Sequence, residues 1–269
     1  METKTKALNQ AVVKYIVIVL MVLDHAVQSF LTPDNPVYFI GRTISRLTGP
    51  VMAFFIAEGY IHTHNVKKYL FRLGIFAIIS SMAFTLFEAG KISVINLELI
   101  PDVEKNAAAW IYISSLGKYL VFTGTSVIFT LFLGLLAILL WDKAKLNVAV
   151  KVLITLAILY LSLFGDWNYW NILFCLIFYF MRNNKKLMWT TFICVALTYI
   201  FNLKFVNIFE FTVEPGLKLY RVGILLVPLF IELFYNGLPG KKSAFNKWFF
   251  YIFYPGHLLV LYILKMIFC

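Results

Sequence analysis

The sequence predicts an all-α fold: a polytopic bundle of transmembrane helices in a single domain over residues 1–269. Of these residues, 61% are hydrophobic and 14% are charged, and the mean hydropathy is +0.84. Soluble domains are only about 45–50% apolar and about 25% charged. The charged residues mostly form short clusters between long apolar runs, which is typical of the loops of a multi-pass membrane protein.

The apolar runs can be counted as membrane spans, because a transmembrane helix needs about 20 mainly apolar residues. By this length criterion, the sequence has about nine spans. They lie near residues 12–31, 37–61, 68–88, 122–141, 147–164, 168–181, 187–203, 218–235 and 247–267. No small-residue cleavage site follows the first span, so we expect it to be retained.

The loop charges predict an orientation, because basic and non-basic loops alternate along the chain. Lysines precede the first span, and the loop that follows it has no cation. The alternation continues to the last basic loop, which contains Lys241, Lys242 and Lys247. The positive-inside rule therefore predicts a cytoplasmic N-terminus and an outer C-terminus in the cell membrane.

Charge and cysteine content argue against nucleic-acid-binding, thiolate-metal and disulfide-framework proteins. The net charge is +11, but its cations lie in these short loops, so we expect no nucleic-acid partner. The three cysteines form no Cys-x-x-Cys pair, so neither a thiolate metal site nor a disulfide framework is expected.

Two predicted outer segments are longer than simple turns. The first, residues 89–121, contains an apolar piece, Ala107–Ser115, which favours an interfacial or re-entrant helix. The second, residues 202–217, is rich in phenylalanine and acidic residues. Either segment could line an entrance for an acceptor, or both could be ordinary loops with amphipathic anchors.

The first two spans contain an unusual group of ionisable residues: Asp24, His25, Arg42, Arg46 and Glu58. Such a residue costs roughly 2.5–3.5 kcal/mol at the bilayer centre on insertion scales, so it usually faces the protein interior. The predicted orientation places the first four in the outer half of the membrane, and Glu58 toward the cytoplasm. This group is the main functional signal of the sequence.

Helix geometry suggests how these residues pair. Arg42 and Arg46 are four residues apart and share a face of one helix. We expect Asp24 to pair with one of these arginines, while His25 points about 100° away and faces a cavity. A buried ion pair that only fixes helix packing is the alternative for Asp24 and Arg42.

Histidines and basic loops supply the remaining candidates. His25 suits a general base, since imidazole titrates near neutral pH. His257 lies in the last span, where we expect Pro255 and Gly256 to break the helix beside a cavity. The pair His62 and His64 lies beside cations at a helix end, so we expect no metal. The inner cations Lys67, Lys68 and Arg72 could hold an anionic ligand such as coenzyme A, or act only as topology signals.

Several stretches resemble the TraX family of integral membrane proteins, which is named for the acetylation of conjugative pilin subunits. The matching stretches are Leu20–His25, Ile40–Tyr69, Phe129–Ile138 and Phe249–Leu259. The family is similar to multi-span acyltransferases that use cytoplasmic acetyl-CoA. The resemblance implies acetyl transfer to an acceptor such as the N-terminal amine of a pilin-like peptide.

Under this resemblance, the histidines of the Asp-His and Tyr-Pro-x-His motifs are His25 and His257. His25 is the expected base, with Asp24 beside it. Arg46 or a protonated His257 would polarise the thioester carbonyl. The residues expected to bind the donor or acceptor are Arg42, Glu58, Lys67, Lys68, Arg72 and Tyr254.

Three other functions remain open from the sequence. The first is O-acetylation of a cell-surface glycan or lipid. The second is a small-molecule or proton-coupled transporter, which also needs buried charges but for which no inverted repeat is visible. The third is an assembly scaffold without catalysis.

Overall fold

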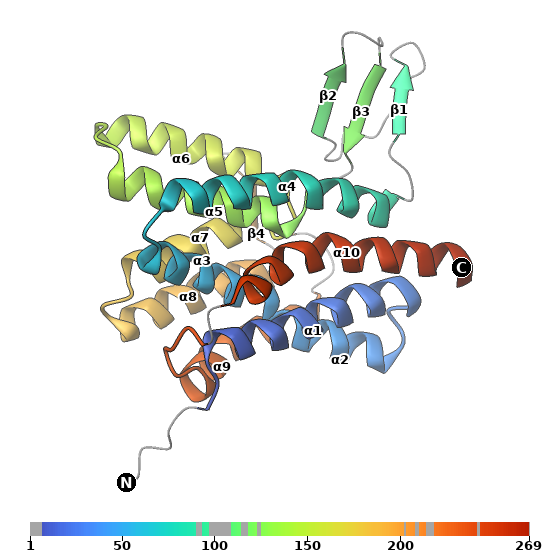
Figure 1. Ribbon diagram of the computed structural model, residues 1–269, viewed down its shortest axis with the longest axis horizontal. Coiled ribbons are helices and arrows are strands. Elements are labelled where there is room, and N and C mark those ends of the chain that lie inside the picture. Colours follow the sequence, from blue (N-terminus) through green and yellow to red (C-terminus); the bar gives the residue numbers. More distant parts are fainter. Residues whose placement is uncertain are drawn as a thin grey trace. The chain divides into compact units, whose positions relative to one another are not determined.

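The structure of the protein is a computed structural model of residues 1–269. The structure describes residues 7–89, 93–96, 109–113, 118–122, 125–201, 203–207, 210–213, 218–240 and 243–268. These residues are mainly helical, as the sequence predicts (Figure 1). The chain divides into two compact units, residues 1–59 with 173–248 and residues 60–172 with 249–269.

The first unit begins with a helical hairpin. Helix α1 (Gln10–Phe30) is capped by Asn9, and helix α2 (Pro36–Ser45) is capped by Asn35. Gly41 on α2 allows a close approach to α1, since a Cβ atom there would lie 3.0 Å from Val27. The Ser45 hydroxyl donates to the backbone oxygen of Leu20 at 2.8 Å and ties the two helices together.

The second predicted span, 37–61, is not one helix. Helix α2 ends at Ser45, and helix α3 begins at Thr48 and runs to His62. Pro50 explains the break. A continuous helix would need the Pro50 nitrogen to donate to the carbonyl of Arg46, but proline has no N–H and its ring clashes at that position. Proline is tolerated in the first turn of α3, where no such bond is required.

The rest of the first unit returns much later in the sequence. Its helical parts are α7 (Asn168–Phe180, from residue 173), α8 (Lys185–Ile200), a 3₁₀ helix η2 (Leu219–Leu225) and α9 (Leu226–Phe234). The predicted span 218–235 is therefore divided between η2 and α9. Between α8 and η2, strands β4 (Leu203–Asn207) and β5 (Glu210–Val213) form an antiparallel pair.

The second unit contains the remaining elements. Its helices are α4 (Val66–Ala89), α5 (Val127–Lys143), α6 (Val148–Ser162) and α10 (Ala244–Phe268, from residue 249). Its strands are β1 (Ser93–Asn96), β2 (Ala109–Ile113) and β3 (Lys118–Phe122), in the antiparallel order β1-β3-β2 (Figure 1).

Two expectations in this unit are wrong. Within Ala107–Ser115, the described residues form β2 and not a helix, since tryptophan, tyrosine and isoleucine pack well on a pleated strand. In the last span, α10 continues through Pro255 and Gly256 without a break. One lost backbone bond is tolerated in this 25-residue helix, which buries Tyr254, Leu258 and Leu261 on one side.

Three helices of the described chain are long and apolar enough to cross a membrane: Gln10–Phe30, Val66–Glu88 and Trp248–Phe268. Large apolar side chains on these helices are exposed, including Val19 (67%), Ile78 (68%) and Met266 (69%). Exposed apolar surface of this extent is typical of contact with lipid. These features are typical of a membrane protein.

Candidate functional site

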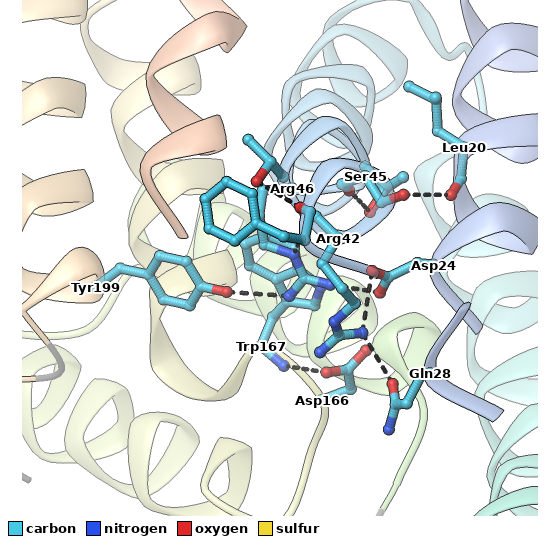
Figure 2. Close-up of polar contacts among 12 residues, drawn as sticks. Leu20, Asp24, Gln28, Arg42, Ser45, Arg46, Asp166, Trp167 and Tyr199 are labelled. Carbon is cyan, nitrogen blue, oxygen red and sulfur yellow. Dashed lines mark hydrogen bonds and ion pairs between the residues drawn. The ribbon is translucent and has the colours of Figure 1, made fainter. Parts of the chain in front are cut away.

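The hairpin of α1 and α2 brings three predicted site residues together in the first unit. Asp24 Oδ1 lies 3.0 Å from Arg42 Nη1, and Asp24 Oδ2 accepts a hydrogen bond from Arg46 Nη2 (Figure 2). All three residues are buried. The predicted pairing of Asp24 with an arginine is confirmed, and the carboxylate in fact serves both guanidinium groups.

Further contacts fix the orientation of the Arg46 side chain. Its Nη1 donates to the hydroxyl of Tyr199 on α8 at 3.1 Å, and its Nε donates to the Arg42 backbone oxygen at 3.3 Å (Figure 2). Because Arg46 follows the last residue of α2, its Nε–H satisfies a carbonyl at the end of that helix. The planar fork of arginine makes these three contacts at once.

Arg42 is held by a different set of neighbours. Its Nη1 donates to Gln28 Oε1 at 2.8 Å (Figure 2). Its guanidinium carbon lies 5.0 Å from the ring centre of Tyr220 and 5.9 Å from that of Tyr38. The Tyr220 ring also lies 5.6 Å from the guanidinium carbon of Arg46. Rings at these distances stabilise a cation through their negative faces.

A third arginine approaches from η2. Arg221 Nη1 donates to the Tyr199 backbone oxygen at 3.1 Å, and its guanidinium carbon lies 4.9 Å from the Tyr199 ring centre. Gly223 allows η2 to lie close to α2, since a Cβ atom there would come within 1.8 Å of the Thr43 backbone oxygen. We define the Arg–Tyr cluster as Asp24, Arg42, Arg46, Tyr199, Tyr220 and Arg221.

The charges of the Arg–Tyr cluster decide what it can do chemically. Its six residues contain three guanidinium groups and one carboxylate, so their formal sum is positive. Guanidinium groups in a low-dielectric interior stabilise negative charge strongly. The cluster is therefore suited to hold an anionic group or to polarise a carbonyl.

His25 and Glu58 also belong to the first unit. His25 follows Asp24 on α1 and is buried, at 6% exposed. It has contacts with neighbouring groups and is not a free side chain. Glu58 lies on α3, where it is half-buried and close enough to Tyr235 to act on it electrostatically. Glu58 is thus placed beside the end of α9 and is not one of the six residues that define the Arg–Tyr cluster.

His257 and Tyr254 lie next to each other on α10 in the second unit, and both are buried. His257 Nδ1 is 3.1 Å from the Phe253 backbone oxygen. The imidazole stacks on the Phe253 ring at 5.6 Å and meets the Tyr254 ring edge-on at 5.3 Å. If Nδ1 carries the hydrogen and donates it to that oxygen, Nε2 carries the lone pair needed for base chemistry.

The predicted inner cations differ in how far their side chains are buried. Lys67 and Lys68 are exposed in the first turn of α4, whereas Arg72 is half-buried one turn further on. Arg72 hydrogen-bonds Tyr251 of α10, and the neighbouring Phe76 ring packs on Tyr251 at 4.9 Å. Within the ranges described above, no three His, Cys, Asp or Glu side chains are gathered as they would be to hold a metal ion.

Sequence reasoning missed several members of the site. Arg221 stands in the predicted span 218–235 and, like Arg42 and Arg46, is a charge within an apolar run. Tyr199 and Tyr220 gave no signal, because the chain has 15 tyrosines and Tyr199 is 153 residues away from Arg46. Only the fold brings them together.

Comparison with known proteins agrees with this reading of the sequence. The family model described as TraX protein matches residues 9–101 and 105–265. A probable fimbrial assembly protein FimC, serogroup H1, from Dichelobacter nodosus is 31% identical over 255 residues, which cover 94% of each chain. No solved structure matches. The family match over nearly the whole chain, supported by this relative, shows that the protein belongs to the TraX family.

Proposed function

We propose that this chain is a membrane-embedded acetyltransferase that moves an acetyl group from cytoplasmic acetyl-CoA to an acceptor at the membrane or its outer face. The observation that carries the proposal is the ion-paired group of Asp24, Arg42 and Arg46, buried in apolar helices. Buried ionisable groups in such helices are costly and are usually kept for function. Membership of the TraX family is consistent with this activity.

The proposed reaction uses these groups in defined roles. The nitrogen of the acceptor amine attacks the thioester carbonyl, and His25 takes a proton from this nitrogen as the new bond forms. Arg46 stabilises the oxyanion that forms, with Asp24 and Tyr199 holding its guanidinium in place. The carbon–sulfur bond then breaks, and coenzyme A leaves as a thiolate that takes up the proton held by His25, which regenerates the base.

Donor binding is assigned to groups nearer the cytoplasm. Lys67, Lys68 and Arg72 are proposed to hold the phosphates of acetyl-CoA, since cations bind phosphate through charge-assisted hydrogen bonds. Glu58 would orient the donor. Arg42 is proposed to bind substrate beside Arg46. A protonated His257 is the alternative to Arg46 for polarising the thioester carbonyl, and Tyr254 is proposed to bind substrate.

The acceptor proposed first is the N-terminal amine of a pilin-like or small peptide. The relative from Dichelobacter nodosus is named as a probable fimbrial assembly protein, and a fimbrial subunit would supply such an amine. A hydroxyl of a cell-surface glycan or lipid is the second acceptor class. We also propose that the chain crosses the cell membrane about nine times, with a cytoplasmic N-terminus and an outer C-terminus.

The alternative function is a transporter, which the broken helix in the second predicted span favours. The helix break between α2 and α3 lies directly beside the buried Arg46, and broken helices next to charges are common at the binding sites of carriers. Flux of a substrate in vesicles without acetyl-CoA binding would support this alternative.

The test is acetyl transfer by purified protein in detergent, with radiolabelled acetyl-CoA and a cell-surface extract as the acceptor pool. The intact mass of the labelled product identifies an amine or a hydroxyl acceptor. His25→Ala and His25→Gln are expected to reduce kcat by at least about 100-fold, the effect of losing a general base. His62→Gln, in an exposed histidine at the end of α3, is the matched control and should keep full activity.

Two results would overturn the proposal. Full activity of both His25 variants would remove His25 from its role as base. Absence of acetyl transfer to any acceptor, together with no binding of acetyl-CoA that free coenzyme A displaces, would reject the enzymatic function itself.

A further inference from the structure

A group of neutral polar side chains is fully buried at the start of α5 in the second unit. It consists of Ser126, Thr130 and Asn171, each 0% exposed. Ser126 precedes the first residue of α5, Thr130 lies one turn further along the same face, and Asn171 comes from α7. We call these three residues the α5 polar site.

Hydrogen bonds hold Thr130 and Asn171 in place within the α5 polar site. Asn171 Nδ2 donates to Thr130 Oγ1 at 3.2 Å, and the single hydroxyl hydrogen of Thr130 is shared between the backbone oxygens of Val127 (2.9 Å) and Asp166 (3.0 Å). Gly165 makes this approach possible, because a Cβ atom there would lie 2.3 Å from Thr130 Cγ2.

The backbone beside the site is also strained. Trp167 and Asn168 both adopt positive φ values, 64° and 43°, which are uncommon for residues other than glycine. The bonds from Asp166 N to the Thr125 oxygen (2.8 Å) and from Thr125 N to the Phe164 oxygen (2.7 Å) hold this turn against the start of α5. Strained backbone tends to occur at sites that the surrounding structure maintains for a purpose.

Two polar atoms of the site have no hydrogen-bond partner within the described chain: Asn171 Oδ1 and Ser126 Oγ. Ser126 stands at the helix cap, yet its hydroxyl makes no capping bond to α5. The large majority of buried polar atoms in proteins are satisfied by protein or by ordered water. An amide oxygen can only accept, whereas a hydroxyl can donate and accept. The missing partner must therefore donate to Asn171, and it can either donate to Ser126 or accept from it.

We infer that the α5 polar site binds one or two water molecules that link Asn171 Oδ1 to Ser126 Oγ. Water fits because the three side chains of the site are neutral and the partner must act as a donor. Ser126 lies one helical turn from Thr130, and Asn171 donates to Thr130, so both atoms belong to one small cluster that one or two waters can link. This water would hydrate the start of α5 inside an apolar helical unit.

The test is a double-mutant cycle on the full-length protein in detergent, read as melting temperature. Ser126→Ala should lower the melting temperature by roughly 2–4 °C, the shift expected for the loss of one hydrogen-bonded link. Asn171→Ala should lower it further, because this variant also loses the hydrogen bond to Thr130. If water links the two residues, the double variant should melt no lower than the less stable single variant. Losses that simply add, or a higher melting temperature for Ser126→Ala, would overturn the inference.

Ser162→Ala provides the control cycle. Its hydroxyl is equally buried but donates to the Leu159 oxygen of its own helix. The loss of melting temperature in Ser162→Ala should therefore add to the loss in Asn171→Ala. If Asn171→Ala does not fold, Asn171→Ser replaces it in both cycles. A second readout is the nuclear Overhauser effect from water to the Asn171 amide in protein labelled with ¹⁵N-asparagine. A cross-peak that is lost in Ser126→Ala is expected, and no cross-peak in the parent protein would contradict the inference.

Discussion

At the scale of single residues, Asp24 is the carboxylate that pairs with two buried arginines of the first unit. One carboxylate contacts the guanidinium groups of Arg42 and Arg46, and all three residues are buried. Removing one partner of a buried ion pair costs about 3–5 kcal/mol, because the remaining charge stays buried without compensation. An exposed ion pair contributes only about 0–1 kcal/mol. The burial of Asp24 therefore makes it far more important than an average acidic residue.

We predict that Asp24→Asn lowers the free energy of unfolding by about 3–5 kcal/mol, since two adjacent guanidinium groups then face a neutral amide. The measurement is the melting temperature in detergent. Lys143→Gln is the matched control, because Lys143 pairs with Asp142 through a side chain that is 69% exposed, so this variant should lose about 1 kcal/mol or less. Adding Arg42→Gln to Asp24→Asn should restore part of the loss. Equal losses in the two single variants would contradict the prediction.

Part of this site could be read from the sequence and part could not. Asp24, Arg42 and Arg46 are conspicuous because they are charges within apolar runs, and helix periodicity predicted that Asp24 meets an arginine. The sequence could not reveal that Tyr199 and Tyr220 surround them, because tyrosine is ordinary in an apolar helix. Their contact with the arginines depends on the packing of α8 and η2, which are distant in the chain.

At the scale of elements, two prolines in apolar spans have opposite effects. At Pro50 the chain forms two helices, and side chains satisfy the carbonyls at the end of α2. Arg46 Nε donates to the Arg42 oxygen, and the Thr48 hydroxyl donates to the Ser45 oxygen at 2.9 Å. At Pro255 the helix continues. Hydropathy does not distinguish the two cases, because the difference depends on which side chains can replace the lost backbone bonds.

The contact between η2 and α2 gives a second prediction. Gly223→Ala should destabilise the protein by about 1–3 kcal/mol or more, because the new Cβ would lie 1.8 Å from the Thr43 oxygen and must push η2 away. Melting temperature in detergent measures this loss. The matched control is Gly256→Ala, where a Cβ meets nothing within 4 Å and should stabilise α10 by about 0.5–1 kcal/mol. The same sign of change in both variants would show that the close contact does not matter.

At the scale of the whole molecule, each compact unit is built from two separate stretches of sequence. The first combines residues 1–59 with 173–248, and the second combines residues 60–172 with 249–269. Composition and hydropathy could predict a helical membrane protein, since they depend only on local runs. They could not predict this interleaving, which follows from long-range packing. The strand β2 was also missed, because a short run of apolar and aromatic residues suits a strand as well as an interfacial helix.

The proposed orientation makes a prediction for the whole chain. In a variant whose native cysteines are replaced by serine, Asp34→Cys lies in the exposed turn between α1 and α2, and Lys145→Cys lies between α5 and α6. A membrane-impermeant maleimide should label Asp34→Cys in intact cells and Lys145→Cys only after permeabilisation, because basic loops stay in the cytoplasm. The reverse pattern would place the N-terminus outside.

The separation in sequence between α2 and α8 also matters while the chain is being made. Asp24 is only 22 residues ahead of Arg46, so their ion pair can form as soon as the hairpin leaves the ribosome and enters the membrane. Tyr199 is synthesised 153 residues after Arg46. At a synthesis rate of about 5–20 residues per second, Arg46 must wait roughly eight to thirty seconds for this partner. During that interval the early carboxylate keeps the nascent hairpin compatible with the bilayer.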